Sequence, residues 1–422
     1  MLHSFLCGWS LIISKARMCF MLTILVCLIG CQIRDPADPI LETPTIIAPA
    51  PEVGHSVTTT PIVTATPPTS PGGGFLEILD EAILLDGDRI VAIDPLQGTQ
   101  YEMDHIPNTR MHFNSGTGKS PVSPDGQWLA YLVVSDTETV RRQYILVFLE
   151  LITGERMTYS VPPISGEMFW LPDSQHLLLT VLENNADRAL WLFNTFEGTR
   201  TVVQRPFPYQ VRDISPEGKY LYITDKAGFG YGEKQVDLMS GSTTNSQSVN
   251  LTSDRLRELQ ALWSPDGSKI AVNVADPARE STSPVCFCLD RTDYAYILEL
   301  SSSERYEISL PQYTLLVEFS PDSEQIIYQD FGNCEMCASV NLPICILDVE
   351  TRQSQCIEQR GFFPTWSPDG EKLAFLLYNT PESELFLGVY DLRTGVARIF
   401  YDYEITQYVV PQWVRLRPAS EP

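Results

Sequence analysis

The residues in this sequence best suited to covalent or metal chemistry are the six cysteines that lie beyond Cys31. Cys286 and Cys288 form a C-x-C pair, and Cys334 and Cys337 form a C-x-x-C pair further along the chain. In an exported protein an even number of such cysteines favours disulfides. Four thiolates could instead bind zinc, although C-x-C departs from the usual ligand spacing. Disulfide formation and zinc binding are therefore both retained as alternatives for these four cysteines.

Two further cysteines, Cys345 and Cys356, lie at about equal distances from a predicted turn near Thr351. The segments on either side of this turn alternate apolar and polar residues, which predicts a β-hairpin. Cysteines placed opposite each other on the two strands of a hairpin can face one another. We therefore expect a disulfide between Cys345 and Cys356.

No other combination of side chains predicts an active site, and we expect no cofactor. The three histidines beyond residue 100 (His105, His112 and His176) fall on different parts of the predicted fold, so a three-histidine metal centre is not expected. The stretch N-S-G-T-G-K-S at 114–120 is only partly like a phosphate-binding loop, because Phe113 stands where the first glycine is required. No G-x-S-x-G motif is present.

A repeat built on the turn formula S-P-D-G organises most of the chain. Proline presets φ for a type I turn, aspartate can accept nearby backbone N–H groups, and glycine takes the left-handed conformation that follows. Ser174 and Ser323 replace the glycine and Glu217 replaces the aspartate, so these turns are expected to be less ideal. Six copies occur, and their prolines follow one another at steps of 44 to 56 residues: Pro124, Pro172, Pro216, Pro265, Pro321 and Pro368.

Each copy reads as two successive hairpins, which gives a unit of four strands. The residue before the turn serine is often aromatic, as at Trp263, Phe319 and Trp366, and is expected to fill the space between neighbouring sheets. The repeats resemble the WD40-like PD40 repeats of TolB-type β-propellers over about residues 75–417. This resemblance implies an all-β propeller made of four-stranded antiparallel blades.

The two ends of the repeat region complement each other. Residues 81–103 supply three strands of a blade without its inner strand, and residues 408–416 supply one inner strand. We expect these segments to form one shared blade that closes a ring of seven. Six blades are the alternative, but they would leave exposed strand edges at the N-terminal hairpin.

The first thirty residues predict export and lipidation. Lys15 and Arg17 precede an apolar run from Met18 to Gly30, which is too short to span a bilayer but is typical of a signal peptide. The sequence L-I-G-C ending at Cys31 resembles a bacterial lipobox, which implies cleavage before Cys31 and lipidation of its thiol. The expected location is the extracytoplasmic side of a bacterial membrane. An ordinary signal peptide or a short anchor is the alternative.

We therefore expect a lipoprotein signal peptide at 1–30, a lipidated cysteine with a disordered Pro/Thr-rich tether at 31–74, a propeller at 75–417 and a tail at 418–422. The formal net charge of −24 argues against a nucleic-acid partner, because phosphate binding requires concentrated lysine and arginine. We expect a monomer that touches the membrane only through its lipid.

These features favour a non-catalytic propeller that binds a protein, a peptide or a cell-envelope component. The alternative is a carbohydrate-active enzyme, a polysaccharide lyase or glycosidase, because some PD40-type lyases resemble this ring. The S-P-D-G turns are short, so the face with the long loops between the second and third strands of each blade is expected to contact the partner. A covering role for these loops, cross-tied by cysteines, is the competing explanation. Aromatic side chains suit protein interfaces, and the candidates on this face are Phe207, Tyr209, Phe229, Tyr231, Phe287 and Phe331.

Overall fold

The structure of the protein is a computed structural model. Its described elements are all strands, and in this part of the chain no helix is long and apolar enough to cross a membrane. The described residues are 57–58, 79–87, 89–105, 109–113, 119–135, 144–151, 153–183, 187–207, 209, 211–225, 236–243, 248–252, 257–275, 292–331, 342–379, 384–400 and 410–416.

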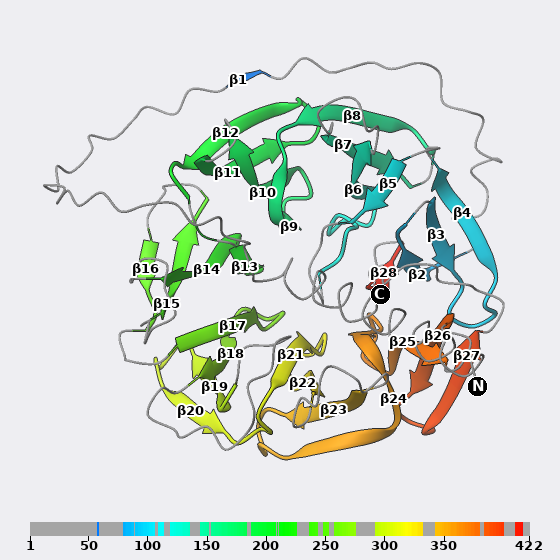
Figure 1. Ribbon diagram of the computed structural model, residues 1–422, viewed down its shortest axis with the longest axis vertical. Helices are drawn as coiled ribbons and strands as arrows, with labels where there is room; N and C mark the ends of the chain where they lie inside the picture. Colours follow the sequence, from blue (N-terminus) through cyan, green and yellow to red (C-terminus); the bar gives the residue numbers. More distant parts are fainter. Residues whose placement is uncertain are drawn as a thin grey trace, which may run out of the picture.

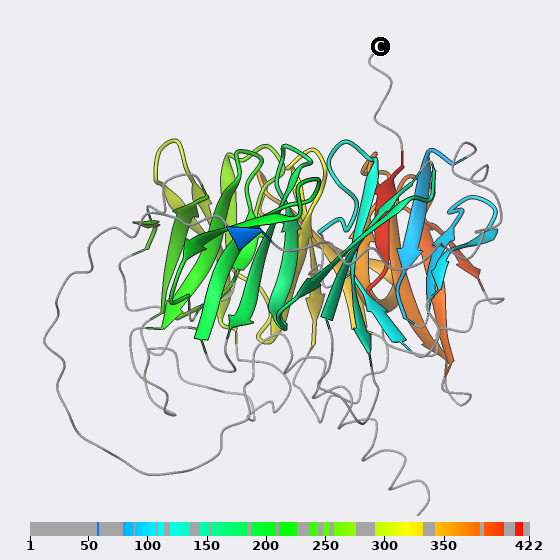
Figure 2. The same cartoon turned by 90° about the horizontal axis from the view of Figure 1, so that it is seen from above.

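The strands form four-stranded antiparallel groups arranged around a common centre (Figure 1), and Figure 2 shows that they cross the thickness of the resulting disc. The first groups, each given from the inner strand outward, are β28 (Gln412–Arg415), β2 (Glu81–Leu85), β3 (Arg89–Ile93) and β4 (Gln100–His105); β5 (Thr109–His112), β6 (Trp128–Ser135), β7 (Tyr144–Glu150) and β8 (Arg156–Val161); and β9 (Ile164–Trp170), β10 (His176–Glu183), β11 (Asp187–Asn194) and β12 (Thr199–Gln204). The two-residue strand β1 (Val57–Thr58) pairs with β12.

The later groups follow the same plan. They are β13 (Val211–Ile214), β14 (Lys219–Asp225), β15 (Val236–Ser242) and β16 (Ser248–Asn250); β17 (Arg257–Trp263), β18 (Lys269–Ala275), β19 (Tyr294–Glu299) and β20 (Arg305–Ile308); β21 (Thr314–Phe319), β22 (Gln325–Asp330), β23 (Leu342–Asp348) and β24 (Ser354–Trp366); and the last part of β24 with β25 (Lys372–Asn379), β26 (Glu384–Asp391) and β27 (Val396–Phe400). Strand β24 therefore serves two neighbouring groups.

The S-P-D-G turns have the geometry that their composition predicts. The four glycines Gly126, Gly218, Gly267 and Gly370 have φ values between 72° and 77°, in the left-handed region that glycine adopts without a steric penalty. In the last turn, the Ser367 hydroxyl donates to the carboxylate of Asp369 and accepts the N–H of Lys372 at 2.8 Å. One serine therefore ties together both sides of the turn.

The two turns with serine in place of glycine keep the same conformation. Ser174 and Ser323 have φ values of 56° and 66°, which is unfavourable for a residue with a Cβ. Each hydroxyl accepts the backbone N–H of the aspartate in the preceding turn, Asp125 and Asp266 respectively, at 3.0 Å. In both turns the unfavourable φ of the serine is thus accompanied by a hydrogen bond between neighbouring blades.

The hydrophobic core lies between adjacent groups of strands, not inside any one of them. Leu84 of β2 packs in one cluster with Tyr131 of β6, and Ile83, whose side chain points to the other face of β2, packs with Leu376 of β25. The aromatic residues before the turn serines, Trp263, Phe319 and Trp366, are buried in such interfaces as predicted.

The N-terminal and C-terminal strands of the ring share one sheet. Strand β28 pairs antiparallel with β2, with Ile83 opposite Trp413 and Glu81 opposite Arg415. Buried side chains of β28 enter the clusters on both sides, Trp413 with β25 and β26 and Val414 with β6. The all-β propeller of four-stranded antiparallel blades is confirmed, whereas the total of seven blades and the boundaries of the segments outside the ring stay predictions.

Candidate functional site

A cavity of about 430 Å³ opens near the centre of the ring, on the side of the S-P-D-G turns. The turn prolines Pro124, Pro321 and Pro368 form part of its wall, together with buried indole rings from three blades. Apolar walls with a few polar groups are typical of sites that bind small molecules or single side chains. Its lining includes the side chains of Lys119, Glu318, Trp170, Trp366, Trp413 and Arg415.

An ion pair spans the centre of the ring beside this cavity. The Lys119 ammonium lies 2.5 Å from Oδ1 of Asp213, whose side chain is fully buried. Lys119 precedes β6 and Asp213 belongs to β13, so the pair bypasses the blade of β9 that lies between them (Figure 1). Burial raises the pKa of Asp213, while Lys119 and two backbone N–H groups act in the opposite direction. The ammonium therefore compensates an otherwise costly buried carboxylate.

Two carboxylates on inner strands repeat one structural contact. Asp213 accepts the backbone N–H of Trp263 at 2.5 Å, and Glu318 accepts the backbone N–H of Trp366 at 3.1 Å. In each case the tryptophan belongs to the following copy of the repeat, so the carboxylate joins two neighbouring blades. Glu318 also accepts the Thr365 hydroxyl at 3.1 Å.

The sequence did not single out Lys119, Asp213 or Glu318. A signal for the two carboxylates was present, because each stands two residues before a turn serine and its partner tryptophan stands one residue before the next turn serine. No comparable signal exists for Lys119, whose partner is 94 residues away and is brought near only by the closed ring.

Burial raises the pKa of two carboxylates on inner strands, Glu167 of β9 and Glu318 of β21. Desolvation raises the pKa of Glu167 to about 7, with Asp213 raising it further and Arg212 and Lys119 opposing. Desolvation likewise raises the pKa of Glu318 to about 7, against its two hydrogen bonds and Lys119. Both shifts follow from placing carboxylates in a confined space that already holds the charge of Asp213.

The partner-binding candidates predicted from the sequence divide into three groups. Phe207 is fully buried, packed among Phe169, Val203 and Tyr220, so its ring is part of the core and not available to a partner in this structure. Tyr209 and Phe331 are half-buried. The remaining three candidates, Phe229, Tyr231 and Phe287, lie outside the described residues.

The cysteines predicted from the sequence fall into two groups, those that the structure describes and those outside the described residues. Cys345 of β23 lies directly opposite Cys356 of β24, and a disulfide joins them. Cys345 is almost completely buried, so the bond links the core of the blade to its outer strand. The lipidation candidate Cys31 and the four cysteines for which zinc and disulfide stay open, Cys286, Cys288, Cys334 and Cys337, lie outside the described residues.

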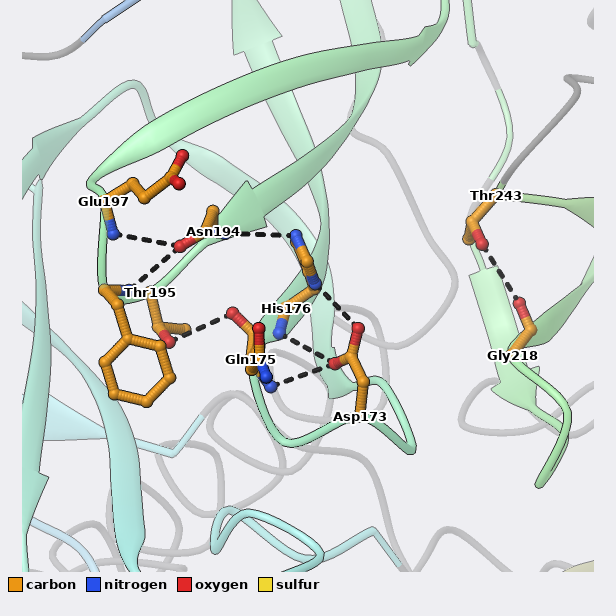
Figure 3. A network of polar contacts seen from close by, with 9 residues as sticks. Asp173, Gln175, His176, Asn194, Thr195, Glu197, Gly218 and Thr243 are labelled. Carbon is orange, nitrogen blue, oxygen red and sulfur yellow. Dashed lines mark hydrogen bonds and ion pairs between the residues drawn. The ribbon is translucent and has the colours of Figure 1, made fainter.

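The described histidines are separate from one another. His176 is the first residue of β10, where its Nδ1 is 2.7 Å from Asp173 and its Nε2 is 3.3 Å from the side-chain amide of Asn194 (Figure 3). His112 lies 3.9 Å from Asp86 in another blade, and His105 is at the end of β4. No group of three or more metal-binding side chains is found within the described ranges.

No protein-family model matches this sequence, and no curated protein matches it either. Solved structures are similar at the level of fold. An oligogalacturonate lyase in complex with manganese has a TM-score of 0.53 and 13% identity, covering 82% of this chain and 85% of its own. The oligogalacturonate lyase of Vibrio parahaemolyticus has a TM-score of 0.53 and 12% identity, covering 76% of this chain and 85% of its own.

TolB from Acinetobacter baumannii is also similar, with a TM-score of 0.46 and 15% identity, covering 79% of this chain and 66% of its own. At these identities the likenesses concern the fold alone, because propellers host unrelated functions. The β-propeller expected from the repeats is confirmed by the lyase structures.

Proposed function

We propose that this chain is an exported, lipid-anchored β-propeller that binds a protein, a peptide or another cell-envelope component without catalysing a reaction. One observation carries the proposal: three ionisable side chains at the centre of the ring make contacts between blades. Lys119 pairs with Asp213, Asp213 binds the N–H of Trp263, and Glu318 binds the N–H of Trp366. Groups held in this way stabilise the scaffold, which leaves the surface loops for recognition.

The partner surface that we propose is the face opposite the S-P-D-G turns. Tyr209 and Phe331 belong to this face and are half-buried, so part of each ring is available for contact. Tyr209 stacks on Tyr222 with ring centroids 5.2 Å apart, and the N–H of Phe331 donates to the carbonyl of Tyr313. A ring held by stacking, as that of Tyr209 is, loses little freedom on binding, which suits an interface.

Photo-crosslinking in cells tests this assignment. A photoreactive amino acid at Phe331 in the full-length chain should give a defined adduct with another envelope component, and the same probe at Ser268, in a turn on the opposite face, should not. Once the crosslinked component is identified, Phe331→Ala and Tyr209→Ala in the chain without the probe should weaken its binding, by about 1 kcal/mol or more at one position or both. An adduct formed at Ser268 alone would place the partner on the turn side.

The carbohydrate-active alternative is tested separately. Likeness to oligogalacturonate lyases concerns the fold, and two carboxylates at the centre of the ring, Asp213 and Glu318, are engaged in contacts between blades. Incubation of the full-length protein with oligogalacturonate should release no unsaturated product. Release of such a product that is lost in Lys119→Met, with the fold retained, would replace the binding proposal by a catalytic one.

A further inference from the structure

The short strand β1 (Val57–Thr58) lies outside the ring, on the outer edge of β12 (Figure 1). It belongs to the Pro/Thr-rich segment at 31–74 that precedes the ring in the sequence. The pairing is antiparallel, with Val57 opposite Arg200 and Thr58 opposite Thr199. The outer strands β4, β8, β16, β20 and β27 have no further strand on that side within the described residues. The segment before the ring thus adds a strand to one particular blade.

The sequence around β1 is better suited to strand pairing than the rest of this segment. Proline cannot donate to a β-ladder, and prolines recur at short intervals in 31–74. The longest run without proline in this segment is 52–60, E-V-G-H-S-V-T-T-T, and Pro61 ends it. Valine and threonine make up most of this run, and both favour strands. β1 lies within it.

The edge of β12 lacks a common protection against further pairing. Charged side chains often guard exposed strand edges. The charged residue within β12 is Arg200, whose guanidinium lies over the ring of Trp191 in the same blade, 3.8 Å from the ring centroid. Thr58 opposite Thr199 is a pair of β-branched residues, a type of cross-strand pair that stabilises sheets. The backbone edge of β12 is therefore suited to receive an extended strand.

The direction of β1 is fixed by its pairing. Thr195, in the turn that leads into β12, donates its backbone N–H and its hydroxyl to the carbonyl of Gln175, in the turn before β10 (Figure 3). β12 therefore runs from the face of the S-P-D-G turns to the opposite face. Because β1 is antiparallel to β12, its N-terminal end points to the opposite face and its C-terminal end to the turn face.

The C-terminal end of β1 thus points to the face on which the ring begins. Leu416, directly after the inner strand β28, donates its N–H to the carbonyl of Asp80, directly before β2, at 2.9 Å. Inner strands end at the turn face, as β24 does at Trp366 before its S-P-D-G turn. The connection from β1 to β2 therefore starts and ends on one face and does not have to cross the disc.

We propose that residues 52–60 form a strap, an extended strand added to the outer edge of β12 that fastens the segment at 31–74 to the side of the ring. β1 is the part of the strap that the structure describes. Docking of the strap does not depend on what the protein binds. One consequence rests on the proposed function: if Cys31 carries the lipid, the anchored part of the chain leaves the ring on the proposed partner face.

A cysteine pair across the ladder tests the strap in the full-length protein purified in detergent. Thr58→Cys with Thr199→Cys places two thiols directly opposite each other, at a separation that a disulfide can bridge. Mild oxidation and peptide mapping without reductant should recover positions 58 and 199 in one cross-linked pair. Thr58→Cys with Ser160→Cys, at an exposed residue of the outer strand β8, is the matched control and should give no such pair.

The same cross-link is expected in a Cys31→Ala background. A failure of the lipid anchor, and with it of that part of the proposed function, is thereby distinguished from a failure of the strap.

Hydrogen exchange of the backbone gives a second measurement that needs no introduced thiol. Thr58→Pro removes a backbone N–H from β1, so exchange in the peptide that covers β12 should rise above the wild-type level, while the peptide that covers β8 should not change. Thr64→Pro is the matched control, because it lies in the same segment but outside the run at 52–60, and it should leave β12 as in the wild type.

The proposal is overturned by either of two results. One is a cross-link from position 58 that is absent, or that forms as readily with Ser160→Cys as with Thr199→Cys. The other is exchange in β12 that Thr58→Pro leaves unchanged.

Discussion

The hydroxyl of Ser323 accepts the backbone N–H of Asp266 at 3.0 Å, which joins the turns of two neighbouring blades. The same relationship links Ser174 to Asp125. In both cases a serine occupies a left-handed position that the other turns fill with glycine. Each replacement of the turn glycine by serine therefore adds a hydrogen bond between two neighbouring blades.

Replacing this serine separates its two effects. Ser323→Ala keeps the strained backbone but loses the hydroxyl, so we expect a loss of about 1 to 2 kcal/mol in the free energy of unfolding. Ser323→Gly loses the same hydrogen bond but relieves the backbone, so its cost should be smaller. Chemical denaturation measures both. The control is Ser303→Ala, at an exposed residue with φ 58°, and a cost equal to that of Ser323→Ala would contradict the explanation.

Removal of β28 tests the closure of the ring. Deleting residues 410–422 removes the buried side chains of Trp413, Val414 and Leu416, each worth about 1.5 to 3 kcal/mol, and exposes the edge of β2. The melting temperature of the whole ring should fall in one cooperative transition. Deleting only 418–422 is the control and should change nothing. An unchanged melting curve for the longer deletion would mean that β28 does not support the ring.

The disulfide between Cys345 and Cys356 is tested by peptide mapping without reductant, which should recover the two cysteines in one cross-linked pair. Cys356→Ser should lower the free energy of unfolding by about 2 to 4 kcal/mol, and reductant should destabilise the wild type by more than it destabilises the variant. Free thiols at both positions in freshly purified protein would be incompatible with the bond.

Lipidation at Cys31 predicts a simple labelling result. A fatty-acid probe supplied to cells should label the wild type and not Cys31→Ala, and the variant should lose its firm attachment to membranes, since two acyl chains hold a protein where one is marginal. Cys345→Ala is a control that should remain labelled. Equal labelling of wild type and Cys31→Ala would exclude this residue as the anchor.

Local chemistry allowed much of the fold to be predicted from the sequence. The S-P-D-G formula predicts the turn conformation from its own four residues, and Gly126 and Gly370 adopt the left-handed φ that it predicts. Contacts that depend on ring closure were not predictable in this way. The partner of Ser323 lies 57 residues away, and nothing in the local sequence of Lys119 indicates Asp213.

Phe207 illustrates a different limit. An aromatic residue in a Pro-rich connection was predicted to lie on the surface, but its backbone N–H donates to the carbonyl of Arg188 at 2.8 Å, which turns the chain back against the blade. Its ring then fills the space beside Tyr220 and Tyr222. Composition identified this residue as aromatic and close to a strand end, but only the path of the connection determines which way the ring points.

The pairing of β28 with β2 has a consequence for how the protein is made. Among the strands of the ring, β28 is the last to be synthesised, yet it lies beside one of the first. Until β28 pairs with β2, the edge of β2 is open and the apolar faces on either side of it are uncovered. A chain in this state is prone to aggregation and degradation. The ring therefore closes only after β28 has been synthesised. A product that stalls before β28, or that loses it, keeps this edge open and can be recognised by quality control.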